Sequence, residues 1–168
     1  MSGSRARGEE TALSDWDFDI EAPDFSAAVA ALPSLVGPLR PLSKQWDRLS
    51  PFPTYMLMLR GPVKVDFLFP GRPNPPAPPW RVSPETRSAI DDHFWDWILW
   101  LASKQQAGRD ELVGEQLKLL HEHLLGPLGL DRSPDSVAAA LTAYLRRRDA
   151  PTPLEREVRP TVERALKP

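Results

Sequence analysis

The chain has 168 residues, enough for one domain with a sizeable core or for two small ones. Its formal net charge of −2 gives no bulk attraction for nucleic acid, and the absence of cysteine excludes disulfides, thiolate catalysis and thiolate zinc sites. We find neither a signal-peptide pattern nor an apolar run of membrane-spanning length, so we expect a cytoplasmic protein with no membrane association.

The first part of the chain predicts a small sheet with one helix. Residues 3–8 read as a tight polar turn, and residues 25–36 carry apolar side chains at helical spacing after Asp24, a suitable N-cap. The β-prone runs predicted to form strands are 16–22, 39–46, 55–60 and 63–69. The last two runs surround Gly61-Pro62, which is typical of a hairpin turn.

Residues 70–80 contain six prolines and therefore cannot join a sheet or a helix interior. We interpret them as a stiff connector, because they lie where the composition changes from strands to helices. Their PxxP spacings leave open a ligand for an aromatic groove, which is the less favoured interpretation.

The rest of the chain predicts a helical bundle. Helix starts are expected at Ser83-Pro84, Ser133-Pro134 and Thr152-Pro153. The tryptophans of residues 91–100 are assigned to the core rather than to an acceptor pocket, with His93 on the helix surface, and Arg146–Arg148 to a solvated helix end. The predicted fold class is thus α+β, with a small mixed-sheet domain at 1–70, a Pro-rich connector at 71–82 and a helical domain at 83–168.

Two acidic residues lie two positions apart on the first predicted strand. Asp15 and Asp17 therefore point to one side, whereas Trp16 and Phe18 point to the other and can be buried. Paired carboxylates repel each other unless a cation lies between them, and oxygen ligands suit magnesium or manganese. A third acid, Asp66, lies in an apolar strand and also needs a partner. The alternative is a solvated edge strand without metal.

A candidate phosphate-binding turn precedes these acids. Gly3 and Ser4 offer backbone N–H groups and a hydroxyl, and Arg5 and Arg7 add positive charge, although an ordinary surface loop is the alternative for the arginines. Lys64 is expected to face solvent, and we interpret Asp19 as a solvated residue of the strand edge rather than as an extra metal ligand.

These motifs together resemble the hallmark of the DNA-polymerase-beta-like nucleotidyltransferases. The matching residues are Gly3-Ser4-Arg5-Ala6-Arg7-Gly8, then Ser14-Asp15-Trp16-Asp17-Phe18, and later Val65-Asp66-Phe67. In that superfamily a glycine-serine turn is followed by an Asp-x-Asp strand and a third carboxylate on a later strand. The resemblance covers residues 3–69 and is greatest to the small bacterial aminoglycoside and minimal nucleotidyltransferases.

The resemblance implies a role for each residue. Asp15 and Asp17 would bind the magnesium or manganese ions that hold ATP, and Asp66 would be a metal ligand, the catalytic base, or both. Gly3 and Ser4 would contact the β- and γ-phosphates, with Arg5 and Arg7 beside them.

The implied reaction transfers a nucleoside monophosphate, AMP from ATP, onto a hydroxyl of an aminoglycoside-like small molecule. The alternatives are a protein-AMPylating enzyme of the antitoxin type and a truncated, non-catalytic binding module of the same fold. Nucleic acid is not an expected partner, and a homodimer is left open.

One departure from the superfamily concerns the start of the sheet. The superfamily has a strand ahead of the glycine-serine turn, but here only two residues precede Gly3, so the domain lacks its expected first strand. A start site assigned too far downstream is the favoured explanation over a truncated domain.

Overall fold

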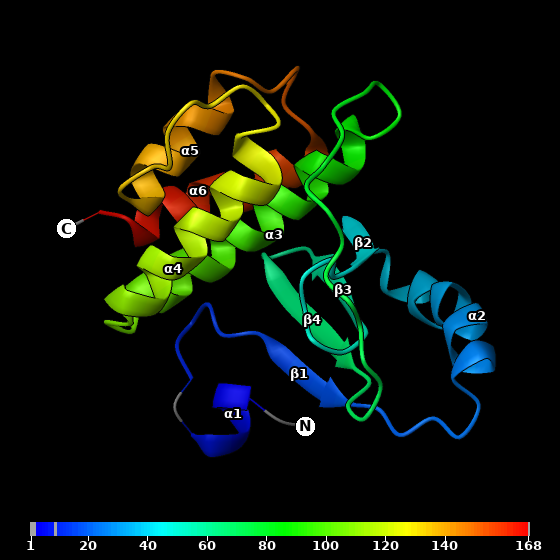
Figure 1. The fold of residues 1–168 in the computed structure, drawn as a ribbon. Coiled ribbons are helices and arrows are strands. Elements are labelled where there is room, and N and C mark those ends of the chain that lie inside the picture. Colours follow the sequence, from blue (N-terminus) through cyan, green and yellow to red (C-terminus); the bar gives the residue numbers. More distant parts are fainter. Residues whose placement is uncertain (1–2, 9, 168) are drawn as a thin grey trace. The chain divides into compact units, whose positions relative to one another are not determined.

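The computed structural model describes residues 3–8 and 10–167 (Figure 1). The chain divides into two compact units, residues 1–77 and residues 78–168, which we call the sheet unit and the helical unit. Strands in the first and helices in the second confirm the α+β class. None of the helices in the described residues is both long enough and apolar enough to span a membrane.

The division between the units falls inside the Pro-rich segment that was predicted as a connector. On the sheet-unit side, the Asn74 side chain donates to Ser50 O at 2.9 Å and the Ala77 amide donates to Arg48 O at 2.8 Å. The first half of the Pro-rich segment is therefore hydrogen-bonded to the loop at residues 48–50 of the sheet unit.

The sheet unit contains α1 (Gly3–Arg7), β1 (Trp16–Asp19), α2 (Phe25–Val36), the 3-10 turn η1 (Gly37–Leu39), β2 (Ser43–Trp46), β3 (Thr54–Leu59) and β4 (Val63–Leu68). The strand order is β1-β4-β3-β2. Strand β1 runs parallel to β4, whereas the β4–β3 and β3–β2 pairs are antiparallel, so the sheet is mixed.

Local sequence signals account for the helix and the hairpin. The Asp24 side chain accepts a hydrogen bond from Ala27 N at 2.9 Å and caps α2, as predicted. Gly61 has a φ of +82° in the turn between β3 and β4, a conformation that a side chain would strain. The predicted hairpin is confirmed.

One face of the sheet packs against α2. The buried cluster on this face consists of Leu32, Val36, Tyr55, Leu57 and Phe69. Because side chains alternate along a strand, the neighbours Met56, Lys64 and Asp66 lie on the opposite face. Trp16 was expected to be buried but is 38% exposed.

Three predicted boundaries in the sheet unit are wrong. Of the residues predicted as a turn, 3–8, Gly3–Arg7 form the short helix α1, because alanine and arginine favour helix, and Gly8 (φ +69°) ends it. Strand 16–22 ends at Asp19, since Pro23 and the capping Asp24 already begin α2. The strand expected from residue 39 begins at Ser43, after the 3-10 turn η1.

The helical unit contains α3 (Arg87–Gln106), α4 (Asp110–Leu120), the π-helical turn η2 (His121–Leu125), α5 (Val137–Leu145) and α6 (Pro153–Ala165). Helix α3 contacts α4, α5 and α6, so it is the central helix of this unit. Its buried residues are Ile90, Asp91, His93, Phe94, Trp95, Asp96, Trp97, Ile98, Leu99, Leu101, Ala102 and Ser103. The core assignment of Trp95 and Trp97 is confirmed, whereas Trp100 is half-buried; His93 is only 5% exposed, so its predicted surface position is wrong.

Two of the three predicted helix starts differ from the structure. Helix α3 begins at Arg87 because Ser83 is used in a preceding turn, in which its carbonyl accepts from the Thr86 amide at 3.1 Å. Helix α5 is capped by Ser136, not Ser133, since the apolar run begins only at Val137. The start of α6 at Thr152-Pro153 is confirmed.

Candidate metal centre

Three carboxylates meet where β1 lies beside β4. Asp15 directly precedes β1, Asp17 is within it, and the parallel register places Asp17 opposite Asp66 of β4. One carboxylate oxygen from each residue lies within 4.8 Å of the other two. Asp15 and Asp66 are each 7% exposed and Asp17 is half-buried. The structure thus brings together the three acids that the sequence singled out.

This convergence follows from strand geometry. Residues two apart on a strand share a face, so Asp15 and Asp17 point the same way, and parallel pairing places Asp66 on that face too. The next acid on the face, Asp19, is exposed, as expected for an edge residue.

A lysine completes the cluster, and its predicted solvent-facing position is wrong. Lys64 is 8% exposed, and its Nζ lies 3.6 Å from an Asp15 oxygen and 3.3 Å from an Asp66 oxygen. It precedes Asp66 by two residues on β4, so it shares the face of the three acids. The same spacing rule that grouped the acids would have included Lys64 once Asp66 was placed on that face.

Arg5 holds the backbone next to the acids. Its Nε donates to Ser14 O at 3.1 Å and to Asp15 O at 3.2 Å, and its Nη2 donates to Ser14 O at 2.8 Å. Its guanidinium carbon also lies 4.3 Å from the centre of the Trp16 ring, a cation–π contact. Arg5 therefore joins α1 to the start of β1 and fixes the backbone at Asp15.

The remaining predicted phosphate contacts belong to α1. Gly3 and Ser4 form its first two residues, and the Ser4 side chain lies outside the described part of the structure. Arg7 is exposed at the C-terminal end of the same helix.

The donor set fits a hard divalent cation. Carboxylate oxygens are the ligands that magnesium and manganese prefer, and three of them within 4.8 Å can approach one ion together. Three negative charges and the positive charge of Lys64 leave a formal charge of −2 at the cluster, which one divalent ion would neutralise.

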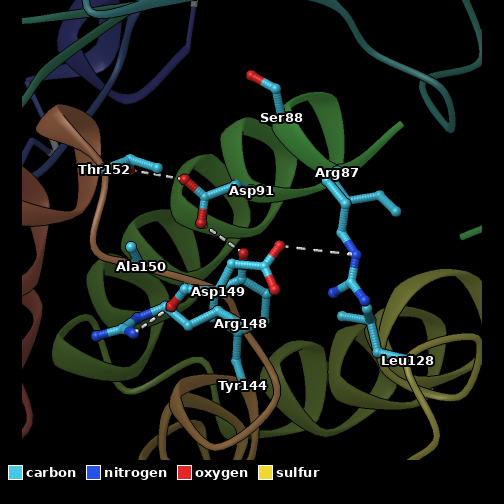
Figure 2. Close-up of a pocket in the computed structure, with 10 residues that line it drawn as sticks. Arg87, Ser88, Asp91, Leu128, Tyr144, Arg148, Asp149, Ala150 and Thr152 are labelled. Carbon is cyan, nitrogen blue, oxygen red and sulfur yellow. Dashed lines mark hydrogen bonds and ion pairs between the residues drawn. The ribbon is translucent and has the colours of Figure 1, made fainter. Parts of the chain in front are cut away.

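A second polar cluster lies in the helical unit, beside a pocket of about 130 Å³ (Figure 2). The buried carboxylate of Asp91 accepts hydrogen bonds from Trp95 Nε1 at 3.1 Å, Tyr144 OH at 2.5 Å and Thr152 Oγ1 at 2.7 Å. Burial, and then the charge of Asp91, raise the pKa of Tyr144 well above its usual range, so the phenol keeps its proton.

Charged groups on the wall of this pocket form ion pairs, and Arg148 does so with Glu155, which does not line the pocket. Arg148 donates to the buried carboxylate of Glu155 at 2.7 Å, and Arg87 lies 3.9 Å from Asp149. With Asp91 bound by three donors, the network joins α3, α5 and the start of α6. Its arrangement is that of a structural polar core, and it offers less for chemistry than the acids of the sheet unit.

Comparison with known proteins leaves the site to be interpreted from its geometry: no protein-family model, curated protein or solved structure matches this chain.

Proposed function

We propose that the chain is a metal-dependent nucleotidyltransferase that moves a nucleoside monophosphate, AMP from ATP, onto an acceptor hydroxyl. The observation that carries the proposal is the convergence of Asp15, Asp17 and Asp66 at the junction of two parallel strands. The glycine-serine and Asp-x-Asp motifs of residues 3–17, which resemble the polymerase-beta-like superfamily, supply the reaction class.

The burial of the acids supports a functional interpretation over a solvated strand edge. Removing a carboxylate from water is costly unless a cation and hydrogen bonds compensate for it. Asp15 and Asp66 are each 7% exposed and lie beside a half-buried Asp17, an arrangement that a sheet does not need for its stability. By contrast Asp19, on the same strand, is exposed to water, as an ordinary edge acid would be.

Each residue has a defined part in the proposed reaction. Asp15 and Asp17 hold the divalent cation, which when bound would neutralise the triphosphate and align the attacking and leaving oxygens. Asp66 is a third ligand of the cation and also accepts the proton of the acceptor hydroxyl. The new bond forms between the acceptor oxygen and the α-phosphorus, the bond from that phosphorus to the bridging oxygen breaks, and pyrophosphate leaves. Arg5 keeps the Asp15 backbone in place throughout.

The test uses the full chain with magnesium and ATP labelled at the α-phosphate, first with an aminoglycoside panel and then with a cell extract. Label on a small molecule supports the antibiotic-type acceptor, and label on a protein supports the AMPylating alternative. Asp66→Asn should lower transfer about 10²–10⁴-fold, the usual contribution of a general base. Asp19→Asn is the control, because it removes an exposed acid from β1, the strand paired with β4.

Metal binding is measured separately from turnover, by titrating the nucleotide-free protein with Mn²⁺. Asp15→Asn and Asp17→Asn should weaken binding, whereas Asp19→Asn should leave it unchanged. Nucleotide binding without any label transfer would point to the non-catalytic alternative. If the Asp15→Asn/Asp17→Asn protein binds Mn²⁺ as well as the parent does, the assignment of these ligands is wrong.

A further inference from the structure

The Lys64 ammonium contacts two of the three carboxylates that the proposed metal would use. Its Nζ is 3.6 Å from Asp15 Oδ2 and 3.3 Å from Asp66 Oδ2, and these acids lie just before β1 and within β4. The lysine side chain is 8% exposed. An ammonium group in this position contacts the acid that precedes β1 and the acid within β4 at once, and so links the two parts of the site.

Because the contact of Lys64 with Asp15 and Asp66 is buried, it affects the stability of the folded site. Three carboxylates with oxygens within 4.8 Å of one another repel strongly where water is excluded. Lys64 supplies one positive charge beside two of these carboxylates, Asp15 and Asp66, so the site can form before any ion is bound. A surface lysine would be screened and would contribute little, but here the partners are as buried as the lysine.

The same contact opposes metal binding. A divalent cation bound to Asp15 and Asp66 would have to share these two carboxylates with the ammonium group or displace it, because like charges a few ångströms apart repel.

We propose that Lys64 is a built-in counter-ion that holds Asp15 and Asp66 together in the metal-free site and lowers the affinity of that site for a divalent cation. Lys64 is a positioning residue in this role, since it acts through the two acids. The inference rests on the proposed function, because it takes the three acids as the metal ligands.

The variant Lys64→Met separates two effects of the lysine: it stabilises the metal-free protein, and it weakens the binding of a divalent cation. Without metal, the melting temperature of the full-length variant should fall, because the acids lose their counter-ion. With saturating Mn²⁺ the difference from the parent should close, and the affinity for Mn²⁺ without nucleotide should rise about tenfold, since the ammonium no longer competes for the oxygens. A purely structural lysine would lower stability without raising metal affinity.

Two lysine variants serve as controls. Lys44→Met removes an exposed lysine from β2 and should change neither the melting temperature nor the Mn²⁺ affinity. Lys64→Arg keeps the positive charge, and its Mn²⁺ affinity should stay close to that of the parent.

The outcomes distinguish this inference from the proposed function. If the parent binds Mn²⁺, Asp66→Asn abolishes the binding, and Lys64→Met binds no more tightly than the parent, the metal site stands and the counter-ion role is wrong. If neither the parent nor Lys64→Met binds Mn²⁺, the metal site itself is wrong. A Lys64→Met protein that folds only when Mn²⁺ is present supports the counter-ion role, whereas one that stays unfolded at saturating Mn²⁺ overturns it.

Discussion

The buried ion pair between Arg148 and Glu155 gives a sharp prediction for the stability of the helical unit. The Glu155 side chain is 2% exposed, and Arg148 Nη2 donates to its Oε1 at 2.7 Å. Arg159 Nη1 lies 3.3 Å from the same oxygen, but the Arg159 side chain is 38% exposed and also binds Glu163 at 2.7 Å. Replacing Arg148 by methionine leaves the buried carboxylate with the weaker partner alone.

The expected loss follows from the burial of Glu155. Removing one member of a buried ion pair costs about 3–5 kcal/mol, because the other charge is left uncompensated. Since Arg159 remains, we expect Arg148→Met to lower the free energy of unfolding by about 2–4 kcal/mol, a large part of the roughly 5–15 kcal/mol typical of a domain.

Urea unfolding followed by tryptophan fluorescence measures this loss, because Trp95 and Trp97 are buried in the helical unit. Arg146→Met is the matched control, since Arg146 is an exposed neighbour on the same segment. The double variant Arg148→Met/Glu155→Met should recover most of the stability, because apolar side chains of similar volume often replace a buried pair without loss.

Two results would refute the reasoning. One is an Arg148→Met protein within about 0.5 kcal/mol of the parent, the range of ordinary surface substitutions. The other is a double variant no more stable than Arg148→Met, which would show that the stranded carboxylate is not the source of the loss.

Further predictions concern a buried hydrogen bond, a titrating acid and a helix cap. Tyr144→Phe removes the donor at 2.5 Å from Asp91 and should cost about 1.5–3 kcal/mol in urea unfolding. Burial, and then the charge of Asp91, raise the pKa of Asp92 from 3.8 to about 6. The folded state therefore holds the Asp92 proton more tightly than the unfolded chain does, so the free energy of unfolding falls as the pH rises from 3.8 to about 6. Asp92→Asn should remove this fall and raise the melting temperature at neutral pH. Asp24→Ala removes the acceptor of the Ala27 amide and should cost about 1 kcal/mol, measured by thermal unfolding.

Features that depend on neighbouring residues could be predicted from the sequence. Alternation along a strand placed Asp15 and Asp17 on one face, and Gly61-Pro62 marked the hairpin between β3 and β4. The caps Asp24 and Thr152 were recognisable because aspartate and threonine are preferred N-cap residues. In the structure each accepts a hydrogen bond from an amide three residues later. The starts of α3 and α5 were less predictable, since Ser83 and Ser133 carry a hydroxyl just as the actual N-cap residues Thr86 and Ser136 do.

Long-range packing decided the rest. Only the parallel pairing of β1 with β4 places Asp66 beside Asp17, and only the burial of that face turns Lys64 from an expected surface lysine into a partner of two acids. Likewise Arg148 was expected in a solvated helix end, but the folding of α6 against the central helix buries its partner Glu155. The sequence by itself determined which side chains share a face; which faces are covered, and therefore which charges must find partners, depends on contacts between residues far apart in the chain.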